Sequence, residues 1–232
     1  MTNNKKEMAK KVIRGALFFF GLPLLMFLLA GTLRWWQAWV YLGISYGASI
    51  ISRVLIARIH PDLVQERGSY DEKKDVKPWD KWLMPLVALA MPTAYYLTAG
   101  LDKRFRWSGP VPLWLYLAAL ILTLAAFCFS SWALVANRFF SAVVRIQTDR
   151  GHKVVDKGPY VIVRHPGYAA GIVVALMFPI MLGSWWAYVP VGIMTVFTVV
   201  RTALEDKTLI NELPGYAGYT HKTRYRLLPG IW

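Results

Sequence analysis

Cysteine is nearly absent from this 232-residue chain, and acidic residues are scarce. A single cysteine, Cys128, excludes an intramolecular disulfide. It lies within a long apolar run, where we expect a small buried hydrophobic side chain. Asp and Glu number 13 against 27 Lys and Arg, which gives a formal net charge of +14. Such a balance suits nucleic acid or a membrane surface, so the placement of the charges has to decide between them.

Charge of either sign is missing from five long stretches, each at least 18 residues long, which excludes a soluble domain with charges interleaved throughout. These stretches are residues 15–33, 35–52, 82–101, 107–137 and 167–200. About 20 apolar residues cross a hydrocarbon core of about 30 Å, so each of the first four suits one spanning helix.

The fifth stretch is too long for one crossing, and Gly183-Ser184 lies at its midpoint. We therefore expect a helical hairpin of Tyr168–Leu182 and Trp185–Val200. The sequence predicts an all-α, polytopic membrane protein with about six transmembrane segments, this C-terminal hairpin included. It contains no internal repeat and no low-complexity segment.

The basic residues collect on one side of this predicted topology. With a cytoplasmic N-terminus and six spans, 22 Lys and Arg fall in cytoplasmic segments. Four lie on the other side, namely Arg34, Lys103, Arg104 and Arg106, and Arg53 lies within a span. This bias follows the positive-inside rule. It favours anionic lipid headgroups over nucleic acid as partners, and places both termini in the cytoplasm.

The chain divides into two regions of different character. Residues 1–136 form an N-terminal transmembrane region, whose connector 58–81 mixes both charge signs with turn residues. We interpret this connector as a solvated cytoplasmic loop, although its Arg67, Tyr70 and Asp71 could cover a site. Residues 137–232 contain most of the candidate catalytic residues. Polar segments lie on either side of the membrane hairpin 167–200 in this region, and the second of them is a cytoplasmic tail.

The segment from Gly158 to Tyr168 gathers polar chemistry at the mouth of a predicted membrane helix. Pro166 suits a first helical turn, which places Arg164 and His165 just before free backbone N–H groups and favours an anion there. Such a cluster is costly beside lipid, which makes it a functional candidate.

At the other end of the hairpin, Arg201 and Glu205 are four residues apart on one helical face, with Asp206 next to them. The two helix ends together predict a pocket for a ligand with both charge signs. S-adenosylmethionine is one such ligand, and Tyr160 and Tyr168 offer π faces to its sulfonium or adenine. Separate explanations stay open: an arginine that snorkels to the interface, an Arg201–Glu205 pair on a helix surface, and an interfacial histidine.

These residues form a recognisable two-part motif. It reads Gly-Pro-Tyr-x3-Arg-His-Pro-x-Tyr over residues 158–168, then Arg-x3-Glu-Asp-x2-Leu from Arg201, Tyr216-x2-Tyr219 and a closing Leu228-Pro229. Over residues 137–232 the chain resembles the isoprenylcysteine carboxyl methyltransferase family. Phospholipid N-methyltransferases share much of this signature. The family usually has Glu-Glu where this chain has Glu205-Asp206, which leaves direct contact by the second, shorter acid open.

The resemblance implies an integral membrane methyltransferase that uses S-adenosylmethionine in a cytoplasmic pocket, without a metal, and has residues 137–232 as its methyltransferase core. His165 and Tyr168 would contact the cofactor, and Arg164 would serve the cofactor carboxylate or the helix end. Arg201 would address a substrate carboxylate, with Glu205 and Asp206 as the acidic pair and Glu205 also beside the cofactor. The rest of the implied lining comes from the preceding loop: Lys153, Val154, Val155, Gly158, Pro159 and Tyr160.

The acceptor favoured by the resemblance is the carboxylate of an isoprenylcysteine-like lipid, which is ionised at neutral pH and needs no general base. One alternative is a phospholipid amine, for which Glu205 or Asp206 would remove a proton. Another is a membrane reductase of the sterol-reductase type that uses NADPH. A scaffold or a transporter has little support, because Arg53 alone among charged residues lies well inside a predicted span.

Overall fold

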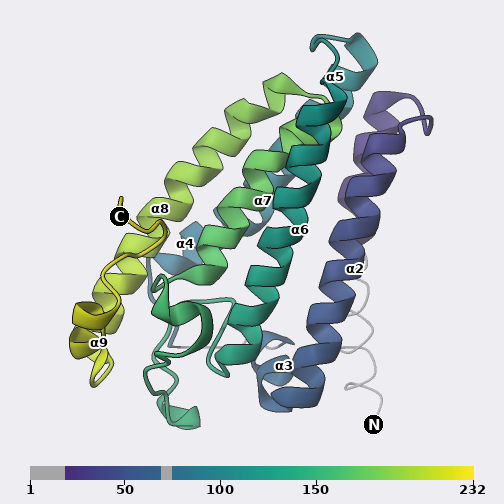
Figure 1. The fold of residues 1–232 in the computed structure, drawn as a ribbon. Helices are drawn as coiled ribbons and strands as arrows, with labels where there is room; N and C mark the ends of the chain where they lie inside the picture. Colours follow the sequence, from purple (N-terminus) through teal and green to yellow (C-terminus); the bar gives the residue numbers. More distant parts are fainter. Residues whose placement is uncertain (1–18, 69–74) are drawn as a thin grey trace, which may run out of the picture.

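The computed structural model describes residues 19–68 and 75–232, and this part of the chain is all-α, without a strand (Figure 1). A first helix covers Phe19–Ala30. The bundle continues with α2 (Trp36–Ile59), α3 (Pro61–Gly68), α4 (Asp80–Pro85), α5 (Met91–Phe105), α6 (Leu113–Ala136), α7 (Pro166–Leu182), α8 (Tyr188–Glu212) and α9 (Tyr216–Lys222). Short helical turns are η2 (Leu86–Ala90), η3 (Thr148–Arg150), η4 (Gly158–Val161) and η5 (Trp185–Ala187).

Four helices of the described part are long and apolar enough to cross a membrane: Trp36–Ile59, Asp80–Phe105, Leu113–Ala136 and Trp185–Glu212. Phe19–Ala30 and Pro166–Leu182 are apolar but shorter. Large apolar side chains point outward along these helices, such as Leu117 and Ile121 of α6, as lipid contact requires. The expected all-α, multi-pass architecture is confirmed at this level, whereas the number of crossings and their orientation stay predictions.

The second candidate span is one rod in which α4, η2 and α5 follow without a break. Pro85 lacks the N–H that would close the α-helical ladder, and the next turn, η2, takes the wider π geometry. This rod places Asp80 at one end and Asp102 at the other.

The predicted hairpin is present, and its second arm is longer than expected. Gly183, with φ of +69°, ends α7 in the left-handed region that glycine tolerates best. After η5, α8 runs to Glu212 rather than ending near Val200. Arg201, Glu205 and Asp206 therefore lie on a continuous helix, and Figure 1 shows α8 crossing the whole bundle down to α9.

The hydrophobic core joins helices from both predicted regions. Trp35, Phe178 and Met181 are at most 1% exposed and pack with residues of the first helix, α2 and α6. Helix α6 packs closely along α7. Cys128 was expected to be buried but is exposed on α6. The exposed side of α6 also carries Leu117 and Ile121 and is suited to contact with lipid.

The connector interpretation is wrong at two described acids. Glu66 in α3 is 3% exposed and Asp80 is fully buried. Both carry charge into the protein because each meets an arginine of the second region, so the connector is packed structure rather than solvated loop at these two positions.

Gly100 on α5 offers a test of this packing. A Cβ atom at this position would lie 2.6 Å from the Met26 carbonyl oxygen of the first helix, so the two helices would have to separate. We expect Gly100→Ala to lower the free energy of unfolding by about 1–3 kcal/mol, the usual cost of overpacking. Gly171→Ala on α7, where a Cβ meets nothing within 4 Å, is the control. Equal thermal midpoints for both variants in detergent would contradict the close approach.

Candidate functional site

A cavity of about 390 Å³ lies where the end of α6, the start of α7 and the polar part of α8 meet. Its polar lining includes Arg67, Asn137, Arg145, Gln147, His152, Lys153, Arg164, His165, Tyr168, Arg201 and Glu205. Its apolar lining includes Met84, Ala88, Leu134, Phe139, Phe140, Val154, Val155 and Leu209. One cavity therefore combines charges of both signs with a wall suited to hydrocarbon.

The start of α7 is fixed by the C-terminal tail. The backbone N–H groups of Arg164 and His165 donate to the carbonyls of Tyr225 and Arg226 at 2.9 Å each. Pro166 then opens the helix, and the His165 and Tyr168 rings stack with centroids 5.8 Å apart. The expected helix start is present, and both rings line the cavity.

Asp206 lies behind the cavity rather than in its lining. Its carboxylate is fully buried and accepts from Arg164 Nε and Nη2 at 2.8 Å each, and from Arg226 Nε at 2.7 Å. Tyr216 Oη donates to it at 3.1 Å, and His165 Nε2 lies 3.2 Å away. Because one carboxylate holds two guanidinium groups and the imidazole, Asp206 positions the residues around the cavity.

Arg164 has little capacity left for a ligand. Besides Asp206, its Nη1 donates to the carbonyls of Thr223 and Arg224 at 3.0 and 2.7 Å. Four of its five N–H groups are thus used within the protein. Of the two roles implied for Arg164, this geometry favours the helix end over the cofactor carboxylate.

Arg201 is held by Asp80, a partner that sequence reasoning missed. Arg201 Nε and Nη2 donate to Asp80 Oδ1 and Oδ2 at 2.6 and 3.0 Å, and Nη2 also reaches the Ala142 carbonyl. Asp80 Oδ2 accepts the Val144 N–H at 2.7 Å. Within the described part of the chain, Nη1 of Arg201 has no hydrogen-bond partner, so this edge of a cavity-lining cation is available to a ligand.

Glu205 also presents one oxygen to the cavity. Its Oε2 accepts the Tyr168 hydroxyl, whereas Oε1 has no hydrogen-bond partner among the described residues. The Arg201–Glu205 pair that helical spacing allowed does not form within that part, because each residue has another partner. An anionic oxygen and a cationic N–H edge therefore face one cavity from adjacent turns of α8.

The loop before α7 contributes some of its predicted residues to the lining and not others. Lys153, Val154, Val155 and Tyr160 line the cavity. The Tyr160 hydroxyl accepts from Asn137 Nδ2 at 3.0 Å.

Gly158 and Pro159 lie outside the cavity lining. A Cβ on Gly158 would meet Trp132 Nε1 and Ala136 Cβ of α6 at 3.1 Å each, and its φ is +60°. This glycine is thus needed for close packing of η4 against α6. Pro159 is buried in η4, immediately before Tyr160.

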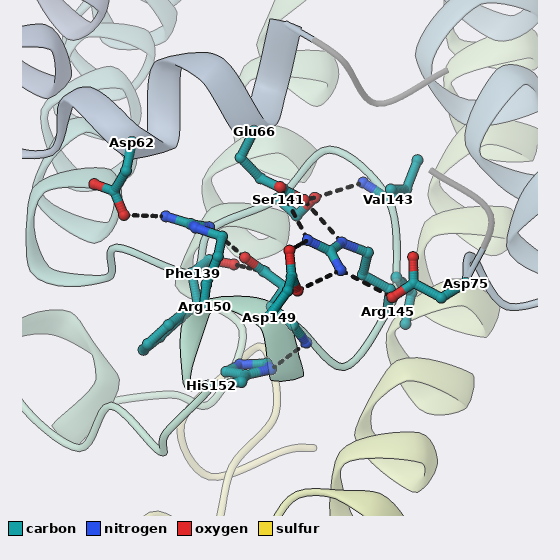
Figure 2. A network of polar contacts seen from close by, with 12 residues as sticks. Asp62, Glu66, Asp75, Phe139, Ser141, Val143, Arg145, Asp149, Arg150 and His152 are labelled. Carbon is teal, nitrogen blue, oxygen red and sulfur yellow. Dashed lines mark hydrogen bonds and ion pairs between the residues drawn. The ribbon is translucent and has the colours of Figure 1, made fainter. Parts of the chain in front are cut away.

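Figure 2 shows an ion-pair network around Arg145, one of the residues that line the cavity. Arg145 is 5% exposed and pairs with Glu66 of α3, with Asp75 and with Asp149, at 2.8–2.9 Å. Arg150 pairs with Asp62 of α3 at 2.6 Å. This network ties the loop 137–152 to α3, although the sequence gives no spacing that links the two.

Further lining residues were missed or set aside by the sequence reasoning. Arg67 donates to the Phe140 carbonyl at 3.2 Å and lies over its ring, so it does cover the site. Tyr70 and Asp71, named with it in the sequence analysis, lie outside the described residues. A Cβ on Gly167 would lie 2.3 Å from Phe140 Cζ, which explains the glycine within the motif. The sequence did contain one indication of the partner of Arg201: Asp80 is an acidic residue at the start of a predicted span, where an unpaired charge would be costly.

His152 gives the site a pH-dependent stability. Its Nδ1 accepts the Gln147 N–H at 3.3 Å, and burial, with Arg145 and Arg150 nearby, lowers its pKa from 6.5 to about 4. The unfolded chain therefore binds a proton that the folded protein excludes, so stability should fall as pH falls from about 6.5 to about 4. His152→Gln should flatten this slope in thermal unfolding, and the exposed His221→Gln should not. A wild-type slope in His152→Gln would refute the assignment.

Comparison with known proteins identifies similar sequences. Over 163 residues the chain is 24% identical to the uncharacterized protein YpbQ of Bacillus subtilis (strain 168), covering 68% of this chain and 88% of YpbQ. Residues 115–211 match the model of the isoprenylcysteine carboxyl methyltransferase (ICMT) family. This segment holds nearly all of α6, all of α7 and the part of α8 with Arg201, Glu205 and Asp206, but not the tail with Tyr216 and Tyr219. The resemblance to the isoprenylcysteine carboxyl methyltransferase family is thus confirmed over residues 115–211.

Proposed function

We propose that this protein is an S-adenosylmethionine-dependent methyltransferase that acts on a lipophilic acceptor within the membrane. The observation that carries the proposal is one cavity in which, among the described residues, Glu205 Oε1 and Arg201 Nη1 have no hydrogen-bond partner beside an apolar wall. The match over residues 115–211 supports it. The sided distribution of Lys and Arg supports a cytoplasmic position for this end.

The residues present fit S-adenosylmethionine in size and charge. A cavity of about 390 Å³ lies within the range of small-molecule sites. When bound, this cofactor supplies a methyl group on a positively charged sulfur. Glu205 Oε1 would accept from its ammonium group, the His165 and Tyr168 rings would flank it, and the loop Lys153–Val155 would line the remaining side.

Asp206 acts in this proposal as a positioning residue. Its contacts fix His165 and Arg164, and through them the entry into α7. Gly158 and Pro159 shape the loop that presents Tyr160. The 137–232 region supplies most of the site, and residues 1–136 complete it with Asp80, Met84 and Ala88.

A carboxylate is the favoured acceptor, with an isoprenylcysteine-like lipid as its first candidate. Arg201 Nη1 would orient an anionic oxygen, while Asp80 keeps the guanidinium in place. Met84 and Ala88 of the α4–η2 rod and Leu134 of α6 form an apolar wall for the hydrocarbon tail. A carboxylate is ionised at neutral pH, so alignment is the main task of the protein.

A phospholipid amine is the second candidate, because Glu205 Oε1 is also placed to accept a proton from an amine. Labelled methyl groups in extracted lipids distinguish the two. Mild base releases a methyl ester, whereas a methylamine keeps its label.

Glu205→Gln should weaken cofactor binding with little change in shape. A hydrogen bond to a charged group contributes about 1.5–3 kcal/mol, so affinity for S-adenosylhomocysteine should fall roughly 10- to 100-fold. Thermal stabilisation of the detergent-purified protein measures it. Glu212→Gln, an exposed position on the same helix that pairs with half-buried Lys77, is the matched control. Stabilisation by NADPH instead of S-adenosylhomocysteine would favour the reductase and reject the proposal.

Arg201 is tested together with Asp80, since removing one charge alone leaves the other buried and unpaired. The double variant Asp80→Asn/Arg201→Gln should keep binding S-adenosylhomocysteine. Its transfer of labelled methyl to S-farnesylcysteine should fall roughly 10- to 100-fold. Undiminished transfer would show that Arg201 does not orient the acceptor.

A further inference from the structure

A second cavity of about 740 Å³ lies at the opposite end of the bundle. The first cavity is lined by the end of α6 and the start of α7, and this one by the start of α6 and the end of α7. Its lining comes from five helix ends and the loop 106–111, and includes Arg34, Asp102, Lys103, Arg104, Arg106 and Tyr116. The proposed methyl transfer uses none of these residues.

Positive charge dominates this cavity. The four basic residues assigned to the poorly charged side of the predicted topology, Arg34, Lys103, Arg104 and Arg106, all line it. Within the described part of the chain none of the four forms an ion pair. Lys103 Nζ lies 5.5 Å from the centre of the Trp35 ring. Because all four line the same cavity, they form a cluster rather than isolated surface charges.

The one acid in the lining is already engaged. Asp102 is 2% exposed and accepts from Ser108 N at 2.8 Å, and from the hydroxyls of Ser108 and Ser184 at 2.6 Å each. Hydroxyls and an amide, rather than arginines, therefore satisfy its oxygens. The charges of the four basic residues stay available to an anion.

Tyr116 provides a second, independent indication of a ligand. It lies in the first turns of α6, lines the cavity and is 5% exposed. Its hydroxyl has no hydrogen-bond partner in the described part of the chain. A buried hydroxyl normally finds an acceptor, and an oxygen of a bound anion would supply one.

The depth of the cavity indicates where the anion comes from. Tryptophans favour the headgroup level of a membrane. Six of them are more than 40% exposed on the segments around this end, namely Trp36, Trp39, Trp107, Trp114, Trp185 and Trp186. Indoles at the headgroup level would bring this end of the bundle to the level of the lipid phosphates.

We propose that this second cavity binds the phosphate of an anionic phospholipid headgroup. Arg34, Lys103, Arg104 and Arg106 would contact the phosphate oxygens, with the Tyr116 hydroxyl as a further donor. This inference is independent of the proposed methyl transfer, because it concerns other residues at the other end of the bundle.

The test compares the full-length protein in nanodiscs of phosphatidylcholine with and without phosphatidylglycerol, by lipid retention in native mass spectrometry and by thermal unfolding. The wild type should retain phosphatidylglycerol. Arg34→Gln/Arg104→Gln should bind it roughly 30-fold more weakly, because each basic side chain near a lipid surface contributes roughly fivefold. Arg58→Gln/Lys81→Gln removes the same charge from exposed positions outside both cavities and should bind phosphatidylglycerol more tightly than the Arg34/Arg104 variant, because the second cavity is intact. Tyr116→Phe should weaken binding without any change in charge.

Equal unfolding temperatures of all variants in pure phosphatidylcholine would show that they fold. The proposal fails when the Arg34/Arg104 variant binds phosphatidylglycerol as tightly as the wild type, or when the control variant loses as much. Millimolar inorganic phosphate in phosphatidylcholine is the third arm. Stabilisation by phosphate that equals that by phosphatidylglycerol, and needs the same arginines, would overturn the lipid as the source of the anion.

Discussion

A single buried carboxylate, that of Asp206, determines how the C-terminal half comes together. Arg164 before α7 and Arg226 of the tail both bind it, and His165 and Tyr216 complete its surroundings. Removing such a charge would leave two guanidinium groups without compensation in the interior. Segments about 60 residues apart therefore depend on one side chain of α8 for their relative positions.

The pairing of Arg201 with Asp80 has the same character and links the two halves of the chain. Asp80 begins the α4–η2–α5 rod, and Arg201 lies on α8, so the two charges hold these elements together beside the cavity. The Arg145 network does the same for α3 and the loop 137–152. Both ion pairs bury charged groups beside the cavity. Because Asp80 neutralises Arg201, one edge of the Arg201 guanidinium can face a ligand without leaving an unpaired cation in the interior.

Sequence reasoning could predict the helices and the hairpin, because charge-free runs and Gly183 depend on local composition. It could also place Arg164, His165 and Glu205 near one another, since helix periodicity and a hairpin fix their approximate positions. Asp80 and Glu66 were assigned to solvent because their arginine partners lie 121 and 79 residues away, and no local pattern links such pairs. The exposure of Cys128 was missed for a different reason. In a membrane protein the lipid-facing side of a helix is as apolar as its buried side, so composition does not distinguish the two.

The length of α7 has a consequence for how a substrate meets the protein. Its 17 residues span roughly 26 Å, which is less than the roughly 30 Å of a hydrocarbon core. With its Gly183 end at the level of the lipid headgroups, its His165 end would stop short of the opposite membrane surface. The reacting groups would then lie below the plane of the lipid heads, where water is scarce. An acceptor could move sideways from the bilayer into the cavity without ever lifting its tail out of the membrane.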